Sequence, residues 1–204
     1  MTASSVAAAI DRSELRHVLV SGTKAGFIAA GAVVLTLAVH RSAVAGLTRE
    51  ALVTSIVVLA GAALSLLPGR WAAARTAEGV AGAAAIGLWG TVVFMAFDIV
   101  VLRPLKAYPW TWDAVGGGST WWYLPIWWML GTYLAWMGGL LTAARARRGA
   151  TGLAGAALPL VAGALVVAGL ATALGAAARF AVAAGAGLTA TLTVLAVAAV
   201  ARRR

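Results

Sequence analysis

The chain has 204 residues, of which 62% are hydrophobic and 11% are charged. A soluble domain is closer to half apolar and about a quarter charged, so a lipid bilayer fits this composition better than water does. The absence of cysteine excludes disulfides, iron–sulfur clusters and thiolate zinc sites. The formal net charge of +10 is scattered between apolar segments, and it forms no continuous basic face of the kind that nucleic-acid binding needs.

Six apolar runs follow one another along the chain and predict an all-α integral membrane protein, a bundle of six transmembrane helices in one domain, residues 1–204. Residues 1–17 are polar enough to stay outside the bilayer, and Ala7 to His17 predicts a short amphipathic helix on its surface. The predicted spans cover about residues 18–39, 51–67, 79–102, 121–144, 151–176 and 180–201. Only the second lies near the lower limit of the roughly 17–25 residues that cross a bilayer.

The second predicted span has recognisable start and stop signals. Thr48 is placed to be its N-cap, with Glu50 in the first turn, where a negative charge favours the helix dipole. Pro68 and Gly69 predict a turn that ends it. The sequence therefore predicts a short helix between these two signals.

A competing interpretation concerns the end of the first span. Ala43-Val44-Ala45, followed by Gly46, matches a signal-peptidase site after an apolar region. The polar leader is long and acidic, however, and His40-Arg41 interrupts the approach to the cleavage point. We therefore expect this helix to be retained.

The distribution of basic residues predicts the orientation, because cytoplasmic flanks carry an excess of Lys and Arg. With both termini cytoplasmic, ten basic residues lie on inner flanks: Arg12, Arg16, Arg70, Arg75, Arg145, Arg147, Arg148, Arg202, Arg203 and Arg204. Five lie on outer flanks: Arg41, Arg49, Arg103, Lys106 and Arg179. We therefore expect both termini to be cytoplasmic and the protein to lie in a bacterial inner membrane.

The segment from about residue 103 to residue 128 differs from the rest of the chain. Six of the nine tryptophans fall in it: Trp110, Trp112, Trp121, Trp122, Trp127 and Trp128. Tryptophan favours the headgroup level of a membrane, so one interpretation is an aromatic belt with the 103–120 loop lying on the outer surface. The other is a contact surface for a partner helix, a lipid or an apolar ligand.

Helical geometry places some of these rings on opposite faces of the fourth span. At about 100° per residue, Trp121, Trp128 and Trp136 lie within roughly 80° of one another. Tyr123 and Trp127 point to the other side. Both faces of this helix are therefore aromatic, which exceeds what a belt alone requires.

Asp98 is the one acidic residue well inside an apolar run. An ionisable side chain in a membrane span is costly and is a functional candidate for that reason. Asp98 shares a helical face with Gly87, Thr91 and Phe94, so we expect it between helices, paired with Arg103 or Lys106. Coupling to a proton or cation and contact with a partner are the alternatives.

Small residues four apart mark the last two spans, in the sets Gly152-Ala156, Gly155-Pro159-Gly163 and Ala183-Gly187. Such spacing lets helix backbones approach closely in lipid. None of these glycines follows a strand, so they do not predict a phosphate-binding loop. We expect them to be packing positions, with Pro159 introducing a kink.

Three functions remain open at this stage. The first is a non-catalytic subunit of a larger membrane complex, and the second is a small carrier or substrate-binding module with an outward-facing site around Asp98. The third is a lipid-modifying enzyme, for which Asp98 with Arg103 or Asp113 would have to supply the reactive groups.

The candidate ligand or partner contacts are Asp98, Arg103, Lys106, Tyr108, Trp110, Trp112, Trp121, Trp122, Trp127 and Trp128. No catalytic residue is predicted. His17 and His40 flank opposite ends of one span and cannot sandwich one haem, and we find no zinc or iron–sulfur ligand set. An apolar cofactor or lipid remains compatible with the sequence. The expected partners are membrane lipids and other membrane subunits, and not nucleic acid.

Overall fold

The computed structural model describes residues 13–105, 123–150, 152–175 and 179–202. Within these ranges the chain forms helices and short connections, with no strand. The α-helices are α1 (Leu15–Arg41), α2 (Gly46–Trp71), α3 (Ala77–Phe97), α5 (Tyr123–Arg147), α6 (Ala154–Ala173) and α7 (Phe180–Ala201). A short π-helix, η1 (Asp98–Leu102), continues α3. The predicted all-helical class is therefore confirmed for the described residues.

Five of these helices are long and apolar enough to cross a membrane, by length and composition. They are α1, α2, α3 together with η1, α6 and α7. Helix α5 is also long enough, with 25 residues. It falls short on hydropathy because tryptophan, tyrosine and glycine, which fill much of it, score lower than leucine, isoleucine or valine.

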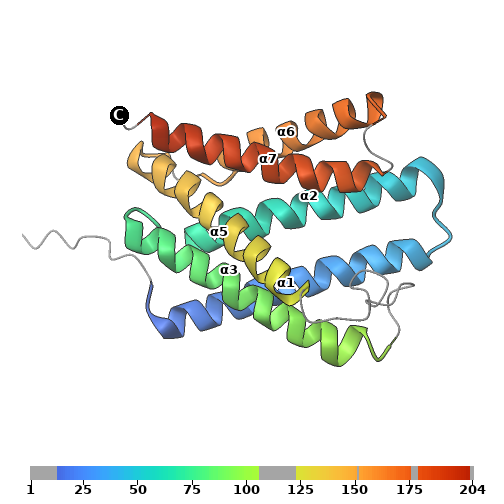
Figure 1. The fold of residues 1–204 in the computed structure, drawn as a ribbon, viewed down its shortest axis with the longest axis horizontal. Coiled ribbons are helices and arrows are strands. Elements are labelled where there is room, and N and C mark those ends of the chain that lie inside the picture. Colours follow the sequence, from blue (N-terminus) through green and yellow to red (C-terminus); the bar gives the residue numbers. More distant parts are fainter. Residues whose placement is uncertain (1–12, 106–122, 151, 176–178, 203–204) are drawn as a thin grey trace, which may run out of the picture.

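Successive helices alternate in direction, so α1 begins at the end of the bundle where α7 ends (Figure 1). We call this end the arginine end. Its described basic residues are Arg16, Arg70, Arg75, Arg145, Arg147, Arg148 and Arg202. The opposite end, where α3 passes into η1, we call the acid-pair end. Its described basic residues are Arg41, Arg49, Arg103 and Arg179.

Helix α5 packs against α2, α3 and α7 and so connects the two sides of the bundle (Figure 1). Its glycines make the close approach possible. A Cβ on Gly138 would overlap the backbone oxygen of Ser65 in α2, and one on Gly131 would overlap the hydroxyl of Thr91 in α3. Small residues at helix contacts are the usual way in which backbones come close without a large apolar side chain between them.

The small residues predicted to pack helices α6 and α7 do so. Ala156 and Ala183 are buried in the main core cluster. A Cβ on Gly187 would lie 2.8 Å from the backbone oxygen of Ala164. Gly152 is the exception, because nothing lies within 4 Å of the position that its Cβ would take.

The predicted end of the second helix is wrong. Helix α2 runs through Pro68 and Gly69 and ends at Trp71. An interior proline lacks an N–H donor and its ring crowds the preceding turn, but the carbonyl of Pro68 still accepts from the N–H of Ala72, at 2.9 Å. A Cβ on Gly69 would lie 2.9 Å from the Cα of Gly139. Contact with α5 therefore extends the helix past its expected stop signal.

The predicted start of this helix is also wrong. Helix α2 begins at Gly46 with Ala45 as its N-cap, so Thr48 lies inside the helix and its first turn has no acidic residue. Glu50 has a different role, because its Oε1 accepts a hydrogen bond of 3.0 Å from the N–H of Ala181 in the first turn of α7. A carboxylate predicted to favour the start of its own helix instead caps a distant one.

The amino-terminal segment departs from the prediction as well. Residues 1–12 lie outside the described part of the chain, but from Leu15 onward the backbone already belongs to α1. His17 is therefore not part of a separate surface helix. Its Nε2 lies 2.8 Å from the backbone oxygen of Trp71 and 3.2 Å from Ser21 Oγ, so it joins the start of α1 to the end of α2.

Candidate functional site

An apolar groove runs along the exposed side of α5, against α3. It is lined by Leu88 from α3 and by Trp128, Met129, Tyr133 and Trp136 from α5, and its volume is about 610 Å³. Met129 is 71% exposed and Trp136 is 47% exposed. The groove is therefore bounded by large side chains that the bundle itself leaves uncovered.

Trp136 lies at a depth that a membrane belt does not explain. It is about 20 Å along α5 from Tyr123, at about 1.5 Å per residue, which is near the middle of the helix. Belt tryptophans sit instead at the ends of spans, at headgroup level. An aromatic belt therefore does not account for the exposed ring of Trp136.

Hydrogen bonding separates Trp136 from the other mid-helix aromatics. The indole N–H of Trp89 donates to Thr23 Oγ1 at 3.1 Å, and the hydroxyl of Tyr133 lies 2.6 Å from Thr193 Oγ1. Both polar groups are satisfied inside the bundle. Trp136 makes no such hydrogen bond among the described residues, and its side chain is 47% exposed. A polar N–H without an acceptor is costly in an apolar medium, so this position favours an external partner.

The predicted distribution of rings on α5 agrees with the structure where it can be followed. Trp128 and Trp136 line the same groove. Trp127 faces α3 instead, and its ring meets that of Phe94 edge to face, with 6.4 Å between ring centroids. Trp121 and the side chain of Tyr123 lie outside what the structure describes.

Asp98 is buried at the acid-pair end, with 4% of its surface exposed. Its Oδ2 lies 3.2 Å from the Nε of Arg103, so the predicted pair with Arg103 is confirmed. Asp98 follows the stripe of Gly87, Thr91 and Phe94 that packs against α5. The carboxylate therefore lies where two helices meet and not on the outer surface of the bundle.

The π-helical turn explains why Arg103 reaches Asp98. In an α-helix, at about 100° per residue, residues five apart point about 140° away from each other. The wider turn of η1 closes with a hydrogen bond of 3.0 Å from the N–H of Arg103 to the backbone oxygen of Asp98. This places residue 103 nearly above residue 98, so the backbone and the side chains join the same two residues.

One oxygen of this carboxylate is left over. Asp98 Oδ1 is buried and has no hydrogen-bond partner among the described residues. Buried polar atoms nearly always have a partner, and single π-helical turns are frequent at functional sites. The Asp98 turn is therefore a second candidate site, separate from the groove on α5.

The structure leaves six predicted contact residues untested. Lys106, Tyr108, Trp110, Trp112, Trp121 and Trp122 lie outside the described residues, as does Asp113. Of the other candidates, Asp98 and Arg103 come together, while Trp127 and Trp128 lie on different faces of α5. In the described ranges, no three His, Asp or Glu side chains gather as they would around a metal ion.

Only part of the groove is predictable from the sequence. Helical spacing places Trp136 on the face of Trp128, but Trp136 is not among the predicted contact residues. Leu88 and Met129 carry no signal in a chain so rich in apolar residues. Comparison with models of known families, with curated proteins and with solved structures gives no match for this chain. The candidate sites therefore rest on their own geometry.

Proposed function

We propose that the chain is a multi-pass integral membrane protein with six spans and cytoplasmic termini, located in a bacterial inner membrane. Five helices suited to crossing a bilayer support this, as do the mid-helix apolar side chains that face outward. Leu35, Leu59, Val166 and Val194 are all exposed. A helix that is apolar on its outer face as well as its inner one is expected in lipid. Helix α5 would be the sixth span.

Within that membrane, we infer that the protein is a non-catalytic subunit of a larger complex and that it contacts a partner transmembrane helix. The observation that carries this proposal is the exposure of Trp136 in the α5 groove at mid-helix depth. A helix laid into an apolar groove is a recurring mode of recognition, and exposed Trp and Met side chains are suited to it. The Trp-rich segment 108–128 would extend the same contact toward the outer surface.

Site-specific photo-crosslinking tests this inference in cells. A benzophenone amino acid replaces Met129 in the groove, and a matched variant carries it at Val166, which is 61% exposed on α6. We expect a discrete crosslinked polypeptide from position 129 and none of the same size from position 166. Substituting Trp136 by Ala in the position-129 variant should remove the band, and substituting it by Phe should retain most of it.

Two results would contradict the subunit proposal. One is crosslinking only to lipid from position 129. The other is the same pattern of products from positions 129 and 166, which would mean that the groove is no more selective than any lipid-facing surface. Two differently tagged copies of the chain, expressed together, show whether the partner helix belongs to a second copy.

A second candidate function is a small carrier or binding module with its site at Asp98. The buried Oδ1 without a described partner and the π-helical turn favour it. In liposomes, Asp98→Asn should then abolish movement of protons or cations through the protein. If neither the wild-type protein nor the variant moves these ions, the ion-coupled form of this candidate fails and the subunit proposal stands alone.

A further inference from the structure

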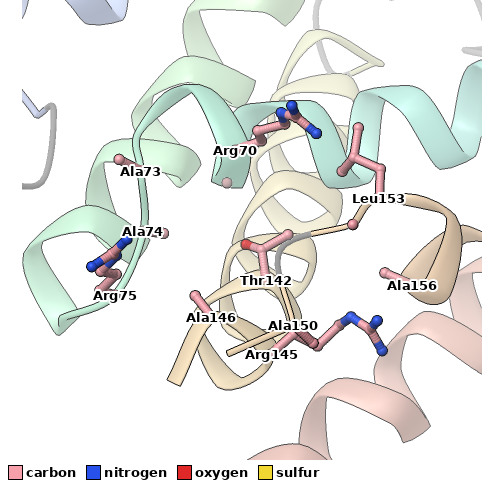
Figure 2. Close-up of a pocket in the computed structure, with 12 residues that line it drawn as sticks. Arg70, Ala73, Ala74, Arg75, Thr142, Arg145, Ala146, Ala150, Leu153 and Ala156 are labelled. Atoms are coloured by element: carbon pink, nitrogen blue, oxygen red, sulfur yellow. The ribbon is translucent and has the colours of Figure 1, made fainter. Parts of the chain in front are cut away.

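A cavity of about 270 Å³ lies at the arginine end, between the end of α2, the end of α5 and the start of α6. Five of the lining residues are alanines, and three are arginines: Arg70 at the end of α2, Arg75 in the connection that follows and Arg145 on α5. Figure 2 shows that the guanidinium groups of these arginines point in different directions. None of the 12 lining residues is acidic. The cavity is thus small, largely apolar in its walls and positive in charge.

Arg70 and Arg145 have no carboxylate partner in the described part of the chain. The Asp98–Arg103 ion pair lies at the opposite end and involves neither Arg70 nor Arg145. Glu78, in the first turn of α3 at the arginine end, accepts a hydrogen bond of 2.7 Å from Ser13 and makes no ion pair with Arg70 or Arg145. Arg70 and Arg145 thus place positive charge at the walls of the cavity that a bound anion would offset.

The position of Arg145 increases the positive potential. Its guanidinium lies against Gly155 in the first turn of α6. That helix has no side-chain cap and no acidic residue in its first turn, so its positive dipole end is not compensated there. The cavity and its arginines carry the inference, and the helix end adds to the same field.

We propose that this cavity binds the phosphate group of an anionic phospholipid. The inference rests on the membrane placement proposed above, in which the ends of α2 and α5 lie at headgroup level. Basic pockets between helices on the cytoplasmic side suit anionic head groups. The volume of about 270 Å³ is just below the roughly 300–1,000 Å³ of small-molecule sites, which suits a head group. Guanidinium groups match the geometry of phosphate oxygens.

Lipid binding by the purified protein in mild detergent tests the proposal. The probes are cardiolipin, phosphatidylglycerol, phosphatidylcholine and inorganic phosphate, and binding is followed by native mass spectrometry. We expect the two anionic lipids to bind and phosphatidylcholine not to. Arg70→Gln and Arg145→Gln should each weaken binding by about tenfold, as for one lost charge-assisted contact. Arg148→Gln, at the same end but outside the cavity lining, should change it by less than about twofold.

Three results would overturn the assignment. The first is equal weakening by Arg148→Gln and Arg145→Gln, because the lipid would then respond to overall charge. The second is competition by inorganic phosphate at the concentration at which the lipid binds, which would assign the cavity to a free anion. The third is lipid binding that neither cavity substitution weakens.

Two controls keep the result interpretable. Thermal unfolding without added lipid shows that each variant is folded. Arg145→Lys keeps the positive charge but loses the planar guanidinium that can bind phosphate with two hydrogen bonds, so it should bind with intermediate affinity. Crosslinking from position 129 in the same variants separates this inference from the proposed function. Weakened lipid binding with intact crosslinking is expected, and loss of crosslinking alone would count against the subunit proposal only.

Discussion

At one end of the bundle, Asp98 is 4% exposed and has Arg103 3.2 Å away; at the other end, Arg70 and Arg145 line a cavity without any acidic residue. The first pair is neutralised within the fold. The second group is not, among the described residues. Arginine is therefore paired with a carboxylate at the acid-pair end, whereas Arg70 and Arg145 at the arginine end are not.

The difference follows from a shortage of carboxylates. The chain has 16 basic and 6 acidic residues, so most arginines cannot have an acidic partner. Arg103, which has one, lies beside the buried carboxylate, where an unpaired charge would be most costly. At the other end, Arg70 and Arg145 have no carboxylate partner among the described residues, so they could serve an external anion. We therefore propose that the Asp98–Arg103 pair serves folding, whereas Arg70 and Arg145 serve binding.

Removal of Arg103 should have the largest effect on stability. Arg103→Leu leaves Asp98 as a buried charge without its base, and breaking buried pairs in this way costs about 3–5 kcal/mol. Because Arg103 is 28% exposed, we expect the lower end of that range, measured as the free energy of unfolding in mild detergent. Asp98→Leu combined with Arg103→Leu should recover most of the loss. A loss below that of Asp98→Asn would show that the pair does not stabilise the acid-pair end.

Neutralising the acid should cost less than removing the base. Asp98→Asn keeps a side chain of the same shape and an acceptor for Arg103 Nε, and it removes only the charge. We expect a loss of about 1–3 kcal/mol, as for a charge-assisted hydrogen bond. The same unfolding measurement checks it. If Asp98→Asn raised the free energy of unfolding instead, the buried carboxylate would destabilise the fold, and its role would be functional.

The hydrogen bond from Ala181 to Glu50 should contribute less to stability than the Asp98–Arg103 pair does. Glu50→Ala removes the acceptor of the Ala181 N–H at the start of α7, and a lost helix cap costs about 1 kcal/mol. Glu14→Ala is the matched control, because Glu14 stands at the N-cap position of α1 but makes no side-chain cap hydrogen bond. Thermal unfolding should separate the two variants. Equal effects would remove the capping role of Glu50.

At the arginine end, removal of a charged side chain should raise the free energy of unfolding instead of lowering it. In zwitterionic detergent without anionic lipid, Arg145→Gln removes a positive charge from the positive end of α6, where charge–dipole terms are about 0.3–1 kcal/mol. We expect a gain of about 0.5 kcal/mol in the free energy of unfolding, which disappears when cardiolipin is added. A clear loss of stability without lipid would place Arg145 among the residues that hold the fold together, and the contrast between the ends would fail.

Much of this fold was predictable because the relevant signals are local. Apolar runs of sufficient length gave every helix, and the unusual burial of one acid gave Asp98 and its partner. The start and end of α2 were not predictable, because Gly69 packs against Gly139 and Glu50 reaches Ala181. Contacts between distant segments overrode the local signals of Thr48 and Pro68.

The candidate sites were less accessible to sequence reasoning for the same reason. Arg70 and Arg145 contributed only to the orientation count, since nothing in their spacing shows that they line one cavity. The exposure of Trp136 depends on which side of α5 is covered by α3, and that is a property of the packed bundle. The aromatic loop prediction for residues 103–120 stays a prediction, because most of that segment lies outside the described residues.

Cysteine accessibility tests most directly whether the arginine end faces the cytoplasm of a membrane-embedded bundle. The chain has no cysteine, so single substitutions give an unambiguous signal. Ala43 lies between α1 and α2 at the acid-pair end, and Ala77 begins α3 at the arginine end; both are exposed. A membrane-impermeant maleimide should label Ala43→Cys in intact cells and Ala77→Cys only after the membrane is opened. Labelling of Ala77→Cys in intact cells, with Ala43→Cys protected or equally labelled, would contradict the account.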